Sequence, residues 1–106
     1  MLIFKNIPLN NYNTFRLGYK ADCLVRVKTE REAVAFMRKN FSWKDPLLII
    51  GDGSNILFTN DFRGTILKPE LKGIRIEKSS GSEVIVSAGA GVKWDNLVKW
   101  TVEKGL

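Results

Sequence analysis

The residues best suited to chemistry lie in one short segment, where an apolar run breaks into a glycine-rich loop at residues 50–55. Gly51 and Gly53 free the backbone to turn sharply and to bring its amide N–H groups close to a ligand. Ser54 and Asn55 add a hydroxyl and a carboxamide at the same point. A phosphate oxygen needs short donors, little steric bulk and a rigid support, so this loop predicts a site for an anionic nucleotide.

Two well-known phosphate-binding motifs do not fit this loop. It is not a Walker A loop, because no Gly-Lys-Ser/Thr sequence follows the glycines. It is not the Rossmann fingerprint either, because the third glycine is missing and residues 56–59 continue apolar instead of opening a helix. A Gly-x-Gly after a strand also occurs in tight turns that bind nothing. The loop alone therefore leaves a phosphate site and a simple turn both open.

The residue types needed for other chemistry are missing. The chain has no histidine and a single cysteine, Cys23. This excludes Ser-His and Cys-His nucleophilic pairs and leaves no credible set of metal ligands. We therefore predict no catalytic and no metal-binding residue, and any chemistry must come from a cofactor or from residues outside this chain. One cysteine also excludes an internal disulfide framework and fits a reducing cytosol.

The first half of the chain predicts the elements that position the loop. Residues 1–20 are expected to be irregular and rich in turns. A strand is predicted over 21–27, and a helix over 30–39 that begins with a capping box of Thr29 and Glu32. The branched aliphatic run from Leu47 to Ile50 predicts a strand buried on both faces. Strand, helix and strand in this order indicate a βαβ unit with a parallel pair.

The second half changes character after Pro69. A short strand is predicted over 64–68, followed by an antiparallel hairpin of 74–77 and 84–87. A helix is predicted over 93–104, ended by Gly105. Its apolar stripe is formed by Trp94, Leu97, Val98 and Thr101. The predicted fold class is therefore α+β with an α/β-type βαβ start.

Composition limits the partners of this chain. The 106 residues suffice for one domain, and the net charge of +6, from 17 basic and 11 acidic residues, favours polyanionic partners. No basic run of about five to eight residues occurs, so we expect no nucleic-acid partner. No apolar stretch approaches the roughly 18 residues of a membrane span, so we expect no membrane partner.

Five motifs, in order, resemble the start of the UDP-N-acetylenolpyruvoylglucosamine reductase (MurB) family, and the resemblance runs from Asn13 to Leu106. The motifs are Asn13-Thr-Phe-Arg-Leu-Gly18, Pro46-Leu-Leu-Ile-Ile-Gly-Asp-Gly-Ser-Asn-Ile-Leu57, Asp61-Phe-Arg-Gly-Thr65, Leu71-Lys-Gly-Ile74 and Ala88-Gly-Ala-Gly-Val-Lys-Trp94. The segments 13–16 and 53–55 match this family together, which favours it over other flavin oxidases of the same fold.

The resemblance implies an FAD-binding fold shared with vanillyl-alcohol oxidase-type flavoproteins and incomplete in this chain. Residues 1–68 would form the first FAD-binding subdomain and 69–106 the truncated start of the second. The implied cofactor-binding residues hold the FAD pyrophosphate, and they are Ile50, Gly51, Asp52, Gly53, Ser54 and Asn55. Asp52 stands where glycine or glutamate is frequent in the family, so its carboxylate would have to point away from the pyrophosphate.

The resemblance also implies a reaction for the parent family, in the cytoplasm and within peptidoglycan synthesis. NADPH would reduce the flavin, which would pass hydride to UDP-N-acetylglucosamine-enolpyruvate and give UDP-N-acetylmuramate. The family's catalytic residues lie downstream of the position that matches Leu106, so the isolated chain is expected to be inactive. The alternative is a non-catalytic nucleotide-binding or scaffold fragment. Expected partners are FAD, a UDP-sugar substrate and a second copy bound through the truncated second subdomain.

Overall fold

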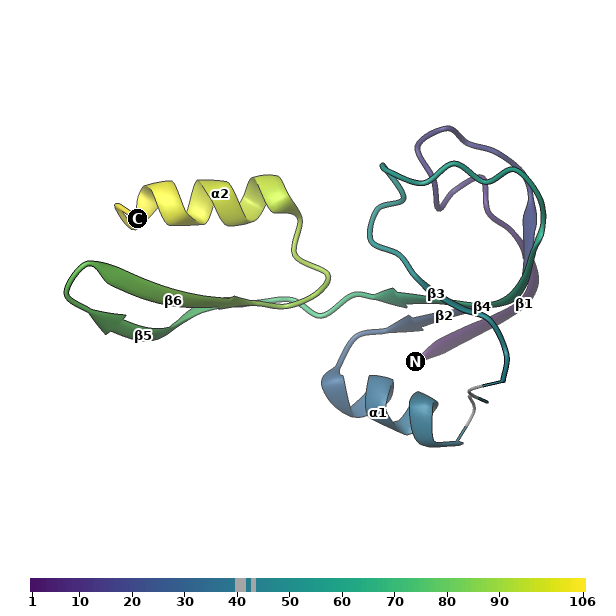
Figure 1. Ribbon diagram of the computed structural model, residues 1–106, viewed down its shortest axis with the longest axis horizontal. Helices are drawn as coiled ribbons and strands as arrows, with labels where there is room; N and C mark the ends of the chain where they lie inside the picture. Colours follow the sequence, from purple (N-terminus) through teal and green to yellow (C-terminus); the bar gives the residue numbers. More distant parts are fainter. Residues whose placement is uncertain (40–41, 43) are drawn as a thin grey trace.

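In the computed structural model, which describes residues 1–39, 42 and 44–106, the chain forms two lobes joined by a narrow connection (Figure 1). The first lobe, residues 1–69, holds a four-stranded sheet and helix α1. The second lobe, residues 74–106, holds a two-stranded hairpin and helix α2. The molecule measures 49 × 32 × 20 Å along its principal axes, and its longest axis runs through both lobes (Figure 1).

The sheet of the first lobe has the strand order β1-β2-β4-β3. Its strands are β1 (Leu2–Pro8), β2 (Lys20–Val27), β3 (Leu47–Ile49) and β4 (Phe62–Pro69). Strands β2, β4 and β3 run parallel, and β1 pairs antiparallel with β2. The parallel strand–helix–strand unit is therefore confirmed, but β4 lies between the two strands that the helix connects. Strands that follow each other in the chain need not be neighbours in the sheet. The crossover from β2 through α1 to β3 passes over one intervening strand, β4.

Helix α1 (Glu30–Lys39) begins as the sequence predicts. The Thr29 hydroxyl accepts a hydrogen bond of 3.1 Å from the Glu32 N–H. In a capping box the Glu32 carboxylate would accept from the N–H of the cap residue, Thr29. Here the carboxylate accepts a hydrogen bond of 2.7 Å from the Lys28 N–H, one residue earlier. It also binds the amino group of Met1 at 2.7 Å. Glu32 therefore ties the helix start to Met1, the residue before β1.

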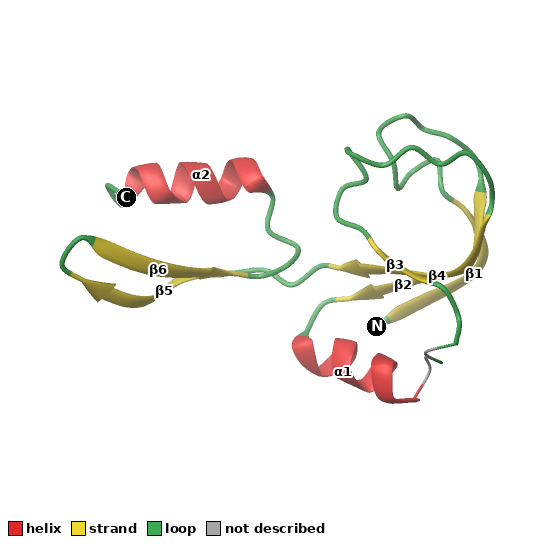
Figure 2. Ribbon diagram, in the orientation of Figure 1, coloured by secondary structure: helices red, strands yellow, loops and turns green. Residues whose placement is uncertain are grey.

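Two apolar clusters fill the two faces of the sheet. The cluster under α1 is centred on Phe36 of the helix, which is 2% exposed. Its buried members are Cys23, Val25, Val27, Phe36 and Leu67. The opposite face is covered by loops rather than by a helix (Figure 2). The buried cluster on that face consists of Leu9, Ala21, Leu24, Ile50, Phe58 and Ile66.

Strand β1 is the main departure from the expected fold. The sequence predicts irregular structure over 1–20, whereas β1 pairs with β2 from Leu2 opposite Arg26 to Pro8 opposite Lys20. Only the segment from 9 to 19 is irregular. The strand shows no clean alternation, because Asn6 takes a φ of 46° and interrupts the pleat. An edge strand that is mostly exposed gives little periodic signal.

Strand β3 also differs from its prediction. It was expected to be buried on both faces, but it lies at the edge of the sheet and Ile49 is 60% exposed. A run of four branched aliphatics is typical of a central strand, which has a hydrogen-bonded neighbour on each side. Strand β3 has such a neighbour, β4, on one side only. Here the run ends in Ile50, which is 2% exposed and turns inward at the start of the loop.

The second lobe contains the predicted hairpin and helix. Strands β5 (Ile74–Ser80) and β6 (Glu83–Ala88) pair antiparallel, and α2 (Trp94–Glu103) runs alongside them (Figure 1). The expected stripe of α2 is only partly covered, because Trp94 is 73% and Val98 42% exposed. Of the described residues, none after Leu67 is buried. The second lobe thus has no closed core of its own.

Candidate functional site

The glycine-rich loop begins at the carboxyl ends of three parallel strands. Val27 of β2 lies opposite Pro69 of β4, and Ile49 of β3 lies opposite Leu67, so these strands end at one edge of the sheet. The Ile50 N–H continues the ladder by donating to the Leu67 carbonyl at 3.0 Å. Ligands of open parallel sheets bind outside this edge. The fold therefore places residues 51–55 where a ligand site is expected.

Gly53 fixes the loop from behind. Its φ is +71°, a conformation that favours glycine. A Cβ at this position would overlap the Tyr12 carbonyl oxygen and lie 2.8 Å from the Asn13 Cα. The Gly53 carbonyl in turn accepts from the Thr14 N–H at 3.3 Å. Gly53 is therefore glycine because the loop packs on the 12–14 backbone.

Asn13 holds the segment against which Gly53 packs. It is the one buried polar side chain among the described residues, at 5% exposure. Its amide nitrogen donates to the carbonyls of Leu9 at 2.7 Å and Leu17 at 3.2 Å, and its oxygen accepts from the Leu17 N–H at 3.0 Å. These bonds satisfy the polar groups of the buried carboxamide and brace the loop from 9 to 17.

The front of the glycine-rich loop has free donors. Within the described part of the chain, no backbone N–H of residues 51–55 donates to a protein acceptor. Successive unpaired N–H groups in a turn form a concavity that suits an anion. The loop can therefore offer its backbone donors to a phosphate oxygen.

The loop borders a pocket of about 400 Å³ between the two lobes. The pocket is lined by Gly51, Asp52 and Ser54 of the loop, by Lys68, Pro69, Glu70 and Lys72, and by residues 90–94. The lining contains three lysines (Lys68, Lys72 and Lys93) and two carboxylates (Asp52 and Glu70), so its net charge is positive. The Lys68 ammonium donates to the Gly51 carbonyl at 2.7 Å. The volume lies within the roughly 300–1,000 Å³ typical of small-molecule pockets.

One of the two carboxylates in this pocket is neutralised. The Arg26 Nε donates to Glu70 Oε1 at 2.6 Å and Nη2 donates to Oε2 at 2.9 Å, a two-point ion pair. Hydrogen bonding to the Arg26 guanidinium holds the pKa of the Glu70 carboxyl below its ordinary value. The paired Glu70 repels an anion less than a free carboxylate does, so the positive balance of the lysines remains.

The connection between the lobes is double. We call it the neck, formed by residues 70–73 and 89–91. The Gly89 N–H donates to the Gly73 carbonyl at 2.9 Å and the Gly91 N–H to the Leu71 carbonyl at 2.7 Å. A Cβ on Gly91 would lie 2.6 Å from the Glu70 Cα. Only glycine allows the two segments this close approach, and both segments contribute residues to the pocket lining.

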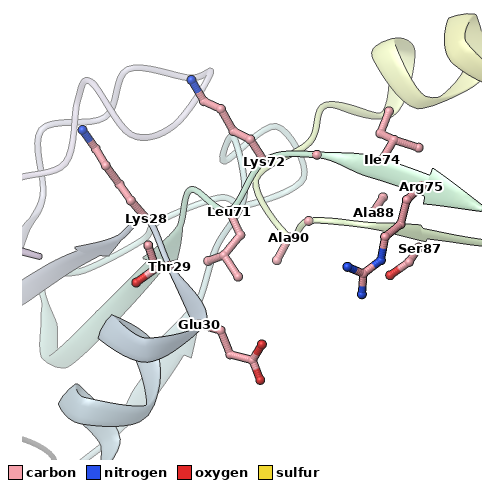
Figure 3. Close-up of a pocket in the computed structure, with 12 residues that line it drawn as sticks. Lys28, Thr29, Glu30, Leu71, Lys72, Ile74, Arg75, Ser87, Ala88 and Ala90 are labelled. Atoms are coloured by element: carbon pink, nitrogen blue, oxygen red, sulfur yellow. The ribbon is translucent and has the colours of Figure 1, made fainter. Parts of the chain in front are cut away.

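A larger pocket of about 580 Å³ also lies at the neck, but its charged groups do not converge. Figure 3 shows Lys28 and Lys72 extending to one side, whereas Glu30 and Arg75 lie on the other. The Arg75 Nε donates a hydrogen bond of 2.5 Å to Glu77 Oε1. This pocket therefore has the weaker claim to an anionic ligand.

The six residues predicted to bind the cofactor do not all line the same pocket. Gly51, Asp52 and Ser54 line the smaller pocket. Ile50 and Gly53 are buried behind it, and Asn55 is exposed outside the lining. Sequence reasoning missed Lys68, Lys72 and Lys93 as lining residues. No local pattern marks them, because strand β4 brings Lys68 to the pocket and the neck brings Lys72 and Lys93 there.

Among the described residues, no group of three or more His, Cys, Asp or Glu side chains could hold a metal ion. Across the same residues, no helix is both long and apolar enough to cross a membrane.

Comparison with known proteins identifies relatives over nearly all of the chain. Residues 21–106 match the family described as "FAD binding domain". The chain is 40% identical over 105 residues to the UDP-N-acetylenolpyruvoylglucosamine reductase of Pseudomonas aeruginosa, covering 96% of this chain and 30% of that protein. Its identity to the reductase of the same name from Azoarcus sp. is 37% over 110 residues, covering 99% of this chain and 31% of that protein. The chain spans about a third of the length of these relatives.

Proposed function

The chain belongs to the FAD binding domain family, and from this we propose that it is the N-terminal part of a UDP-N-acetylenolpyruvoylglucosamine reductase. FAD is its cofactor. The resemblance in sequence and the α+β architecture with parallel strands β2, β4 and β3 agree with this assignment. The observation that carries the proposal is the row of unpaired N–H groups over residues 51–55, beside a pocket with three lysines.

The residues present fit the pyrophosphate of FAD. Gly51, Asp52 and Ser54 line the pocket, and we expect their unpaired backbone N–H groups and the Ser54 hydroxyl to bind phosphate oxygens. Gly53 supports them from behind, and Ile50 anchors the loop in the core. Asn55 would reach the cofactor only with its carboxamide, because it lies outside the pocket lining.

This chain would bind and orient the cofactor and supply no catalytic group. When bound, FAD supplies hydride-transfer chemistry, with NADPH as the hydride source and the UDP-linked enolpyruvyl sugar as the acceptor. The residues that assist the reaction would then lie in the part of the relatives that this chain does not match. We place the reaction in the cytoplasm, within peptidoglycan synthesis.

The two lobes agree with the proposed division of the FAD-binding region. Residues 1–68 would form the first subdomain, with both buried apolar clusters. Residues 69–106 would form the start of the second subdomain. Because Trp94, Val98 and Val102 of α2 are 73%, 42% and 68% exposed, we expect the isolated chain to self-associate through this helix at high concentration. A monomeric mass by light scattering at millimolar concentration would contradict that expectation.

A second candidate function is a non-catalytic nucleotide-binding or scaffold fragment. It is favoured by the lack of any buried residue after Leu67 among those described. A pocket with one wall on a lobe without a core would hold a cofactor weakly. The scaffold form of this candidate differs from the proposed function in that residues 51–54 would not contact FAD in the isolated chain.

The proposal is tested by titrating FAD into the ¹⁵N-labelled chain and following each amide by NMR, which detects weak binding. We expect the amide resonances of Gly51, Asp52 and Ser54 to shift saturably with FAD and much less with riboflavin, which lacks the pyrophosphate. Gly51→Val should abolish these shifts, because a Cβ at Gly51 has nothing within 4 Å and its side chain would occupy the approach to the loop.

The matched control is Gly18→Val, which also has nothing within 4 Å of its Cβ and lies outside the pocket. Saturable FAD shifts that survive Gly51→Val would place the cofactor elsewhere. No shifts at all in a folded chain would favour the scaffold candidate.

A further inference from the structure

Lys68 contacts the glycine-rich loop directly. It is the residue after Leu67, whose carbonyl accepts the Ile50 N–H, so β4 carries it past the start of the loop. Its ammonium donates to the Gly51 carbonyl at 2.7 Å. Among the described residues, it is the one side chain with a hydrogen bond to residues 51–55. Lys68 also lines the pocket of about 400 Å³.

This bond controls the orientation of the peptide between Gly51 and Asp52. In a trans peptide, the C=O and the next N–H point in opposite directions, so fixing the Gly51 carbonyl also fixes the Asp52 N–H. A glycine peptide in a turn otherwise rotates easily, because glycine has few steric limits. A carbonyl oxygen turned toward a phosphate would repel it. Lys68 covers that oxygen and offsets its repulsion of a phosphate in the pocket.

The same ammonium has capacity left for a ligand. A lysine has three N–H donors, and the Gly51 carbonyl takes one of them. The Lys68 side chain borders the pocket beside Lys72, on the neck, and Lys93, just before α2. The Arg26 guanidinium compensates the nearby Glu70, as the two bonds of 2.6 and 2.9 Å show.

We propose that Lys68 is a positioning and anion-binding residue for the cofactor pyrophosphate: it orients the Gly51–Asp52 peptide and donates its remaining N–H groups to the ligand. This inference rests on the proposed function of the loop. The sequence alone predicted that residues 50–55 bind the pyrophosphate. Lys68, a side chain of β4, would supply part of that binding affinity. Diphosphate-bearing ligands gain from this residue, whereas the uncharged flavin ring does not.

Two variants separate the two roles. Lys68→Gln keeps an N–H donor on a side chain one bond shorter but removes the charge, and Lys68→Met removes both. The control is Lys5→Met on β1, which removes the same charge from an exposed position outside the pocket. Each chain is titrated with FAD, ADP and inorganic pyrophosphate by NMR at two salt concentrations. The ¹⁵N order parameter of the Asp52 amide is measured without ligand.

We expect Lys68→Met to weaken binding of FAD, ADP and pyrophosphate about tenfold or more, as for loss of a charge-assisted hydrogen bond. Lys68→Gln should lie between Lys68→Met and the unsubstituted chain. Both should bind with a smaller salt dependence than the unsubstituted chain, because one screened charge is gone. Lys68→Met should lower the ¹⁵N order parameter of the Asp52 amide more than Lys68→Gln does, because the peptide loses its hold on the Gly51 carbonyl, whereas Lys5→Met should match the unsubstituted chain in order parameter and, within about twofold, in affinity.

Two contrary outcomes are distinguishable. If the unsubstituted chain binds FAD at residues 51–54 and Lys68→Met binds as well as Lys5→Met, the role of Lys68 is refuted and the proposed function stands. If the unsubstituted chain binds none of the three ligands, both the cofactor site of this chain and the role of Lys68 are refuted.

Discussion

Replacing Gly53 with alanine is the sharpest test of how the loop is held. A side chain at φ +71° costs about 1–2 kcal/mol in backbone strain. The new Cβ would also overlap the Tyr12 carbonyl oxygen and lie 2.8 Å from the Asn13 Cα, and overpacking of this kind costs about 1–3 kcal/mol. The bonds of Asn13 to Leu9 and Leu17 prevent the 12–14 backbone from moving away easily. We therefore expect Gly53→Ala to lower the free energy of unfolding by about 2–5 kcal/mol.

This loss is large against the roughly 5–15 kcal/mol that stabilise an ordinary domain. The assay is urea unfolding followed by far-UV circular dichroism, with Gly51→Ala as the matched control. Gly51 has an ordinary φ and nothing within 4 Å of a built Cβ, so its replacement should change the free energy of unfolding by less than about 1 kcal/mol. If Gly53→Ala and Gly51→Ala agree within about 0.5 kcal/mol, the packing argument is wrong. The unfolding measurement must therefore accompany any binding assay of a Gly53 variant, because unfolding weakens ligand binding just as a lost contact does.

Three further substitutions test features that hold the site. Asn13→Ala should lower the free energy of unfolding by about 2–4 kcal/mol in urea, because one buried and two partly buried hydrogen bonds lose their partner. Thr29→Ala should cost about 1 kcal/mol in thermal unfolding through loss of the helix cap, and Thr29→Ser should restore it. For Glu70, Arg26 lowers the pKa in the folded state, so the ion pair contributes stability above the unfolded carboxyl pKa of about 4.3 and loses it as the pH falls through the folded value. Glu70→Gln should therefore destabilise the chain at pH 7 more than at pH 3 in urea, and an equal difference at both pH values would contradict this.

Local signals in the sequence were sufficient for several elements. The α1 bounds of 30–39 and the hairpin of 74–88 follow from a cap residue, alternating side chains and a glycine turn. The end of α2 was equally readable, since Gly105 takes a φ of +73°. These features depend on neighbours a few residues apart, so one sequence suffices to predict them.

Pairing between distant segments was beyond the same reasoning. Nothing within Leu2–Pro8 indicates that it will join β2, and nothing in the run 47–50 indicates an edge position. The site shows the same division. The loop at 51–55 was predicted from its glycines, whereas Lys68 joins it through the pairing of β4 with β3, and Lys93 through the path of the neck. The apolar stripe of α2 was predicted by helical spacing, but which of its residues stay exposed depends on the packing of the second lobe.

The neck has a consequence for the thermodynamics of cofactor capture. Two chain segments cross between the lobes, and they are joined by backbone bonds of 2.7 and 2.9 Å. The Glu70 N–H also donates to the Val27 carbonyl at 2.7 Å, which continues the β-ladder into the crossing. Such a double-stranded hinge resists twisting far more than a single linker would. The entropy of aligning the two walls is thus lost during folding and not during binding, which is the advantage of preorganisation.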